Sequence, residues 1–115
     1  MSRGFGRLER GVLALIELTG KPMTFSVMRA AMETKLRRTF DERSLRRALH
    51  RLIDKCMLIA VGNGGPGDPL RYFVHPLRIG MMEDKTRADA LRAALEADPD
   101  SNRAAAAWMA ENVQR

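Results

Sequence analysis

The chain has 115 residues, of which 45% are apolar and 30% are charged, and its formal net charge is +6. This length is enough for one hydrophobic core and too short for two. No apolar run approaches the roughly 18 residues that cross a bilayer. The N-terminal segment also lacks the apolar stretch of a secretion signal, so we expect a cytoplasmic protein. The single cysteine, Cys56, excludes an internal disulfide, and we expect neither a metal nor a cofactor.

The positive charge is concentrated in one half of the chain. Residues 1–51 contain 12 Lys/Arg and 5 Asp/Glu, whereas residues 52–115 contain 8 and 9. The first part is therefore strongly basic and the second part is nearly neutral. A localised positive field favours a polyanionic partner.

The first predicted element is a helix over 7–19, because apolar residues recur there at helical spacing and Gly20 and Pro22 follow. An extended link over 21–25 comes next, since the residue before a proline disfavours helix. Thr24 or Ser26 can cap a second helix that ends near Met32. The basic segment 33–40, ETKLRRTF, either continues this helix or forms a flexible connector.

A third helix is predicted over 42–55, with Asp41 as its N-cap. Its apolar side chains fall on one stripe, which comprises Leu45, Ala48, Leu49, Leu52 and Cys56. Strands over 58–61 and 70–74 follow, and the loop GNGGPGDP between them contains four glycines. This pattern predicts a hairpin with a flexible tip, which His75-Pro76 terminates.

The composition changes at Met81, where the chain becomes alanine-rich. Helices are predicted over 86–97 and 102–112, with a break at 98–100. We therefore expect a domain over 1–80 and a helical extension over 81–115, and a mainly α fold with a small β-hairpin. The apolar residues Leu91, Leu95, Trp108 and Met109 either form a dimer surface or pack on the core of the same chain.

The outer face of the third helix carries the candidate functional residues. Arg43, Arg47 and His50 lie opposite the leucine stripe, with Arg46 and Arg51 on its flanks. A basic helix face of this kind is either a solvated surface or a surface that contacts nucleic acid. In the second case the predicted base contacts are Arg43, Ser44, Arg46, Arg47 and His50, and the predicted backbone contacts are Lys35, Arg37, Arg38 and Arg51.

The order of helix, extended link, helix, basic helix and glycine-tipped hairpin resembles the winged helix-turn-helix superfamily of prokaryotic transcription regulators. The phrase SLRRALHRLIDKCMLIAV, Ser44–Val61, looks like a recognition helix that runs into the first wing strand. The resemblance covers roughly residues 7–76, and Cys56 departs from it because family members often have glycine there. It implies sequence-specific binding to double-stranded DNA by a prokaryotic, phage or plasmid regulator, acting as a homodimer, with any small-molecule effector unknown.

The resemblance implies that the helix over 42–55 enters the major groove and that the hairpin over 58–74 is the wing. It places the wing tip, Asn63–Asp68, at the DNA backbone or minor groove with Arg71 behind it, so that Asn63 and Arg71 are further predicted backbone contacts. Two alternatives stay open: an adaptor that binds protein through the same fold, and a DNA-binding accessory factor in replication or partition. We expect no catalysis, because His50 and His75 form no recognisable catalytic arrangement. The glycine loop also lacks the Lys-Ser/Thr of a phosphate-binding loop.

Overall fold

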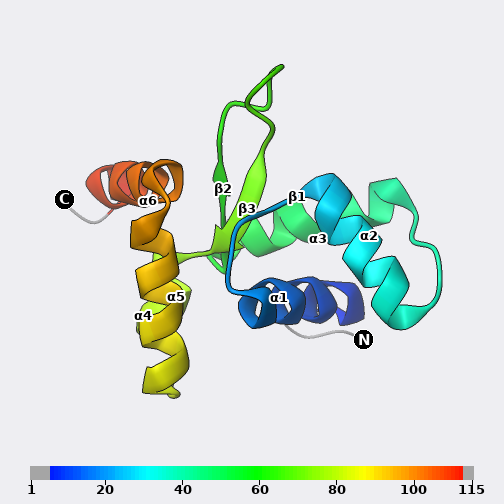
Figure 1. Cartoon of the computed structure of the whole chain (residues 1–115), viewed down its shortest axis with the longest axis horizontal. Coiled ribbons are helices and arrows are strands. Elements are labelled where there is room, and N and C mark those ends of the chain that lie inside the picture. The colour runs from blue at the N-terminus through cyan, green and yellow to red at the C-terminus, as the bar shows by residue number, and fades with distance from the viewer. Residues whose placement is uncertain (1–5, 113–115) are drawn as a thin grey trace.

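The computed structural model describes residues 6–112, which form six helices and one three-stranded antiparallel sheet (Figure 1). The elements are α1 (Arg7–Thr19), β1 (Met23–Thr24), α2 (Phe25–Leu36), α3 (Glu42–Asp54), β2 (Leu58–Val61), β3 (Arg71–Val74), α4 (Pro76–Gly80), α5 (Lys85–Ala97) and α6 (Pro99–Asn112). The predicted fold class, mainly helical with a small β-hairpin, is confirmed. No helix between residues 6 and 112 is both long and apolar enough to span a membrane.

The sheet has the strand order β1-β3-β2. The β2–β3 hairpin pairs Leu58 with Val74 and Val61 with Arg71. The link after α1 was predicted to be extended, and the structure adds that it pairs with the hairpin, with Met23 opposite Tyr72. This pairing fixes the start of α2 against the base of the hairpin.

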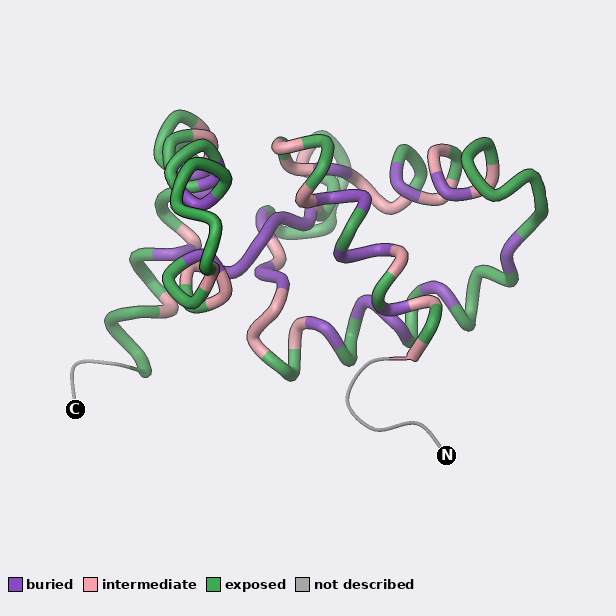
Figure 2. The backbone as a smooth tube through the Cα atoms, turned by 90° about the horizontal axis from the view of Figure 1, so that it is seen from below, coloured by how far each residue is buried: buried purple, intermediate pink, exposed green. Residues whose placement is uncertain are grey.

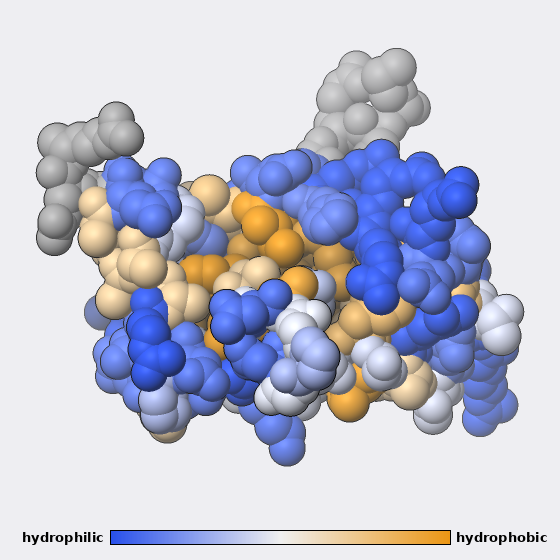
Figure 3. Space-filling view, turned by 90° about the horizontal axis from the view of Figure 1, so that it is seen from above, coloured by the Kyte–Doolittle hydropathy of each residue, from blue (hydrophilic) through white to orange (hydrophobic). Residues whose placement is uncertain are grey.

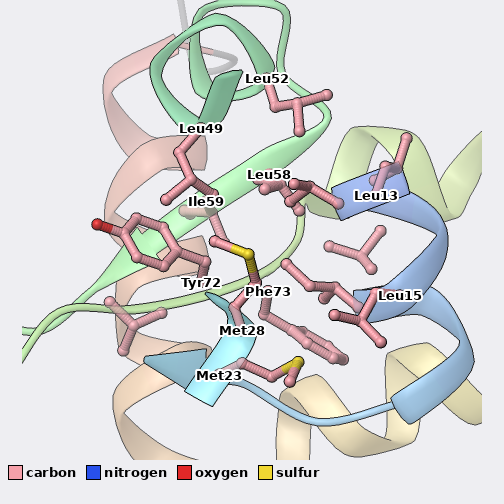
Figure 4. Packing of buried hydrophobic residues seen from close by; sticks show 14 of the residues in the cluster. Leu13, Leu15, Met23, Met28, Leu49, Leu52, Leu58, Ile59, Tyr72 and Phe73 are labelled. Carbon is pink, nitrogen blue, oxygen red and sulfur yellow. The ribbon is translucent and has the colours of Figure 1, made fainter. Parts of the chain in front are cut away.

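The hydrophobic core lies where α1, α2 and α3 meet the sheet (Figure 4). Phe73 is fully buried at its centre, and Met28 of α2 and Leu58 of β2 are also inaccessible to solvent. The apolar stripe predicted for α3 is confirmed from Leu45 to Leu52, because all four of its residues in this range are buried. The opposite face of α3 is consequently exposed.

The second helix extends four residues past the predicted end at Met32 and stops at Leu36. Its N-cap is Thr24, whose hydroxyl accepts a hydrogen bond from the amide of Val27 at 3.3 Å. Arg37 ends the helix in the left-handed conformation, with φ of 55°. The segment that the sequence left open is therefore half helix and half turn.

The junction between α3 and β2 is a tight left-handed turn centred on Cys56, with φ of 58°. The amide of Cys56 donates to the carbonyl of Ile53 at 3.0 Å, and the amide of Met57 donates to that of Leu52 at 2.9 Å. These two hydrogen bonds define a Schellman motif, in which glycine is the usual left-handed residue. Cys56 therefore lies outside the buried stripe on which it was predicted to lie, at a position where a Cβ atom is strained.

The C-terminal helices pack onto the same core as the rest of the chain. Leu91 and Leu95 of α5 are 2% and 6% exposed, and Ala105 of α6 is also buried. Residues 81–112 thus share the core of the preceding part. Of the two alternatives for Leu91 and Leu95, a dimer surface or packing on the core of the same chain, the structure has the second.

The sequence did not predict the short helix α4. Its N-cap is His75, whose Nδ1 accepts a hydrogen bond from the amide of Leu77 at 3.1 Å, and Pro76 occupies its first turn. The helix α6 begins at Pro99, three residues before its predicted start at Asn102. The carbonyl of Asp98 accepts the amide of Asn102 at 2.9 Å, so that the predicted break is the first turn of the helix.

Candidate nucleic-acid interface

The outer face of α3 presents a row of exposed basic side chains. Arg43, Arg47 and His50 are exposed, and their side chains form no hydrogen bond or ion pair with any other residue between 6 and 112. An open depression of about 700 Å³ runs along this face, lined by Asp41, Glu42, Arg43, Arg46, Arg47 and His50. Hydrophilic side chains also dominate the side of the molecule on which α2 and α3 lie (Figure 3).

The N-terminus of α3 is held by Asp41. Its Oδ2 accepts hydrogen bonds from the amide of Ser44 at 3.0 Å and from the Ser44 hydroxyl at 3.1 Å. These hydrogen bonds, and then the charges of Arg43 and Arg47, hold the pKa of the Asp41 carboxyl below its usual value of 3.8. Ser44 was predicted to contact bases, but its hydroxyl proton is already donated within the cap.

Arg46 was also predicted to contact bases, and the structure places it in a different role. Its guanidinium lies 4.0 Å from the centre of the Phe25 ring. Its Nε donates to Oε2 of Glu42 at 3.0 Å. Arg46 therefore holds α3 against α2, and its contact with bases stays a prediction that would cost it these partners.

The C-terminal half of α3 is anchored to α1 through a buried carboxylate. Glu9 is 3% exposed, and it accepts Nζ of Lys55 at 3.0 Å and Nη1 of Arg51 at 3.4 Å. Arg51 was predicted to contact the DNA backbone. Because its guanidinium is shared with Glu9, its main role in the structure is to fix the angle between α1 and α3.

The turn between α2 and α3 is held by hydrogen bonds from side chains of α2. Phe40 is buried, its amide donates to Oε2 of Glu33 at 3.0 Å, and its carbonyl accepts from Nη2 of Arg29 at 2.9 Å. The guanidinium of Arg38 lies 4.8 Å from the centre of the Phe40 ring. Side chains of α2 thus satisfy both backbone groups of the residue that closes the turn.

Two further cations of this turn, Lys35 and Arg37, point to solvent. Both are exposed, and neither side chain has a hydrogen bond or ion pair with another residue in the range 6–112. The backbone tube in Figure 2 is mostly exposed along this stretch. The structure therefore presents Lys35, Arg37 and Arg38 on a fixed basic turn next to the N-terminus of α3.

The hairpin tip, which was predicted to be flexible, is organised by Asp68. Its Oδ2 accepts the amide of Asn63 at 3.0 Å, and its backbone carbonyl accepts the amide of Gly64 at 2.9 Å. Gly62 has φ of 101°, and a Cβ there would lie 3.0 Å from Oδ1 of Asp68. Asn63, a predicted backbone contact, is exposed at this ordered tip.

Arg71, the other contact predicted in the hairpin, is occupied within the molecule. Its guanidinium makes ion pairs at 3.0 Å with both Asp98 and Asp100 at the start of α6. A hydrogen bond from the hydroxyl of Ser101, and then the charge of Arg71, lower the pKa of the Asp98 carboxyl. Arg71 therefore ties β3 to α6, which lies beside the hairpin (Figure 1), and its contact with the DNA backbone stays a prediction that would require breaking these ion pairs.

A buried aromatic contact, for which the sequence carries no local signal, joins the residue after β3 to α6. His75 is 2% exposed, and its ring meets Trp108 edge-on with 4.4 Å between the ring centroids. Its Nε2 has no hydrogen-bond partner among residues 6–112, and burial lowers the pKa of the imidazole. Trp108, a predicted dimer residue, is thus partly used inside the chain, while Met109 is 38% exposed.

Comparison with known proteins adds no relative: no protein family, curated protein or solved structure matches this chain. Among residues 6–112, no group of three or more His, Cys, Asp or Glu side chains could hold a metal ion. The functional assignment consequently depends on the residues of the α3 face and of the turn before it.

Proposed function

We propose that the chain binds double-stranded DNA in a sequence-specific manner, as a winged helix-turn-helix transcription regulator would. In this proposal α3 enters the major groove, the turn over 35–38 contacts phosphates, and the β2–β3 hairpin lies beside the backbone. One observation carries the proposal: no hydrogen bond or ion pair joins the side chains of Arg43, Arg47 and His50 to any other residue within 6–112. Exposed cations that the fold leaves unpaired are available to a polyanion.

The arrangement of the elements supports the proposal. The chain runs through α1, β1, α2, α3 and the β2–β3 hairpin, which is the order on which the resemblance to winged helix-turn-helix proteins depends. The major groove of B-DNA, about 12 Å wide, admits an α-helix. The anchors at both ends of α3, Phe25 and Glu9, hold it in one orientation, as a helix that reads bases requires.

The homodimer stays a prediction. Its surface cannot be formed by Leu91 and Leu95, two of the apolar residues proposed for it from the sequence. Leu91 and Leu95 are buried in the chain's own core, and only Met109 of the original set is clearly exposed. Light scattering coupled to gel filtration measures the oligomeric state directly. A monomer at high concentration would mean that the chain binds one site per molecule, without paired half-sites.

Fluorescence anisotropy with a labelled duplex tests DNA binding. The wild-type chain is expected to bind, and log affinity should fall with log salt by roughly 0.9 for each phosphate that it contacts. The double variant Arg43→Ala/Arg47→Ala removes two charges from α3, and we expect it to lose most of the affinity. Lys85→Ala/Arg87→Ala removes the same charge from α5 and is expected to bind like the wild type.

The two double variants separate a specific surface from a general charge effect. Equal losses in both would show that net charge alone drives binding and would refute the assignment of α3. If the wild-type chain fails to bind any duplex at low salt, the proposed function is wrong and the adaptor becomes the better hypothesis.

A further inference from the structure

We infer that the DNA site of this chain contains two guanines separated by one base pair, read by Arg43 and Arg47 respectively. This inference depends on the proposed function and specifies its DNA target. It comes from two features of α3: which of its cations the fold leaves unpaired, and how far apart these are along the helix axis.

Three basic side chains of α3 and its C-cap already have partners within the molecule. Arg46 is stacked on Phe25 and bonded to Glu42. Arg51 and Lys55 share the buried carboxylate of Glu9. To reach a base, each of these three side chains would have to give up an intramolecular partner. Arg43 and Arg47 would break no hydrogen bond or ion pair within residues 6–112, and both lie in the N-terminal half of α3.

The chemistry of these two arginines favours one base. A guanidinium presents two parallel N–H donors in one plane, and this fork matches the O6 and N7 acceptors of guanine in the major groove. No other base offers two acceptors at that edge. Free arginines on a helix in the groove therefore favour guanine over the other three bases.

The distance between Arg43 and Arg47 along α3 sets the distance between the bases that they can reach. Arg43 and Arg47 are four residues apart and lie on the same face of α3, which separates them by about 6 Å along the helix axis. Successive base pairs are stacked about 3.4 Å apart, so this distance corresponds to about two base-pair steps. A helix that follows the groove thus places the two guanidinium groups at bases with one base pair between them.

The acidic residues at the start of α3 do not interfere with this arrangement. The Asp41 carboxylate is occupied by the amide and the hydroxyl of Ser44. Glu42 lies between Arg46 at 3.0 Å and Arg29 at 3.7 Å. Glu42 is therefore paired with cations inside the molecule. The charge of Asp41 attracts Arg43 and Arg47 but forms an ion pair with neither, so both guanidinium groups keep their N–H donors for the DNA.

Selection of bound duplexes from a random pool, with sequencing, tests the inference. The wild-type chain is expected to enrich two guanines separated by one base pair. Arg43→Ala should lose the preference at one of these positions and Arg47→Ala at the other, each by about 5- to 160-fold, the range of one bidentate contact. Arg87→Ala removes an exposed arginine from α5 and is the matched control, which should keep both preferences.

Each result has a distinct meaning. If the wild-type chain binds duplexes but enriches no guanine pair at this spacing, the inference is wrong while DNA binding stands. The same holds if Arg43→Ala and Arg47→Ala both preserve the guanine preference at the two positions. If the wild-type chain retains no duplex at low salt, the proposed function fails and the inference fails with it. Circular dichroism of each variant confirms that it is folded.

Discussion

The left-handed turn at Cys56 gives a stability prediction that can be worked from the backbone. A residue with a Cβ atom at φ of 58° costs roughly 1–2 kcal/mol relative to an ordinary conformation. Cys56→Gly removes this strain. The greater freedom of glycine in the unfolded chain opposes the gain by about 0.4–1 kcal/mol. We therefore expect a net stabilisation of about 0.5–1 kcal/mol.

Thermal unfolding followed by circular dichroism measures this change. An unfolding entropy of about 2.1 cal/mol/K per residue converts the expected gain into a rise in Tm of about 2–4 °C for a chain of this length. Cys56→Ala retains the Cβ atom and therefore the strain, so it should not raise Tm. The difference between the two variants isolates the effect of the Cβ atom from the loss of the thiol.

Gly20 provides the reverse test at the end of α1. It has φ of 74°, and a Cβ added there would meet no heavy atom within 4 Å. Gly20→Ala should therefore lower stability by about 0.5–1 kcal/mol through the backbone alone. The reasoning is refuted if Cys56→Gly lowers Tm, or if it changes Tm no more than Cys56→Ala does.

Three further predictions follow from the site and the core. Arg37→Gly relieves the same left-handed strain at φ of 55° but removes an exposed cation. Tm in thermal melting should therefore rise, while duplex affinity in anisotropy measurements should fall. A rise of both Tm and affinity would contradict the phosphate contact. Burial lowers the pKa of His75, so below the usual value of about 6.5 the unfolded chain binds a proton that the folded chain does not. The free energy of unfolding should therefore fall as the pH drops from about 7 to 5, by at most about 1.4 kcal/mol per pH unit. His75→Asn can still cap α4 and should flatten this pH dependence in urea titrations. An unchanged pH dependence would show that other groups cause it. Glu9→Gln leaves Arg51 and Lys55 without their buried carboxylate and should cost about 1–2 kcal/mol in denaturant unfolding, whereas the exposed Glu96→Gln should be neutral.

Local sequence signals predicted the elements of this fold because local interactions form them. The buried face of α3 follows from helical spacing, since Leu45, Ala48, Leu49 and Leu52 fall on one side of any helix that contains them. Thr24 and Asp41 are caps because their side chains reach amides three residues ahead. These features need no partner from elsewhere in the chain.

The roles of individual arginines could not be predicted in the same way. Arg46, Arg51 and Arg71 resemble Arg43 and Arg47 in the sequence, and all five were predicted to contact DNA. Arg71 meets carboxylates 27 and 29 residues away, and Arg51 meets one 42 residues away. No local pattern reports an ion pair across such a separation, because it exists only after the chain has folded.

The sequence by itself determined the basic amphipathic helix, the glycine-tipped hairpin and the concentration of positive charge in the first 51 residues. Only the tertiary structure decided which cations face outward unpaired, that Phe40 makes the α2–α3 turn rigid, and that Leu91 and Leu95 belong to the core. The physical reason is that periodicity and capping act over a few residues. Pairing and burial depend on which distant segments come into contact.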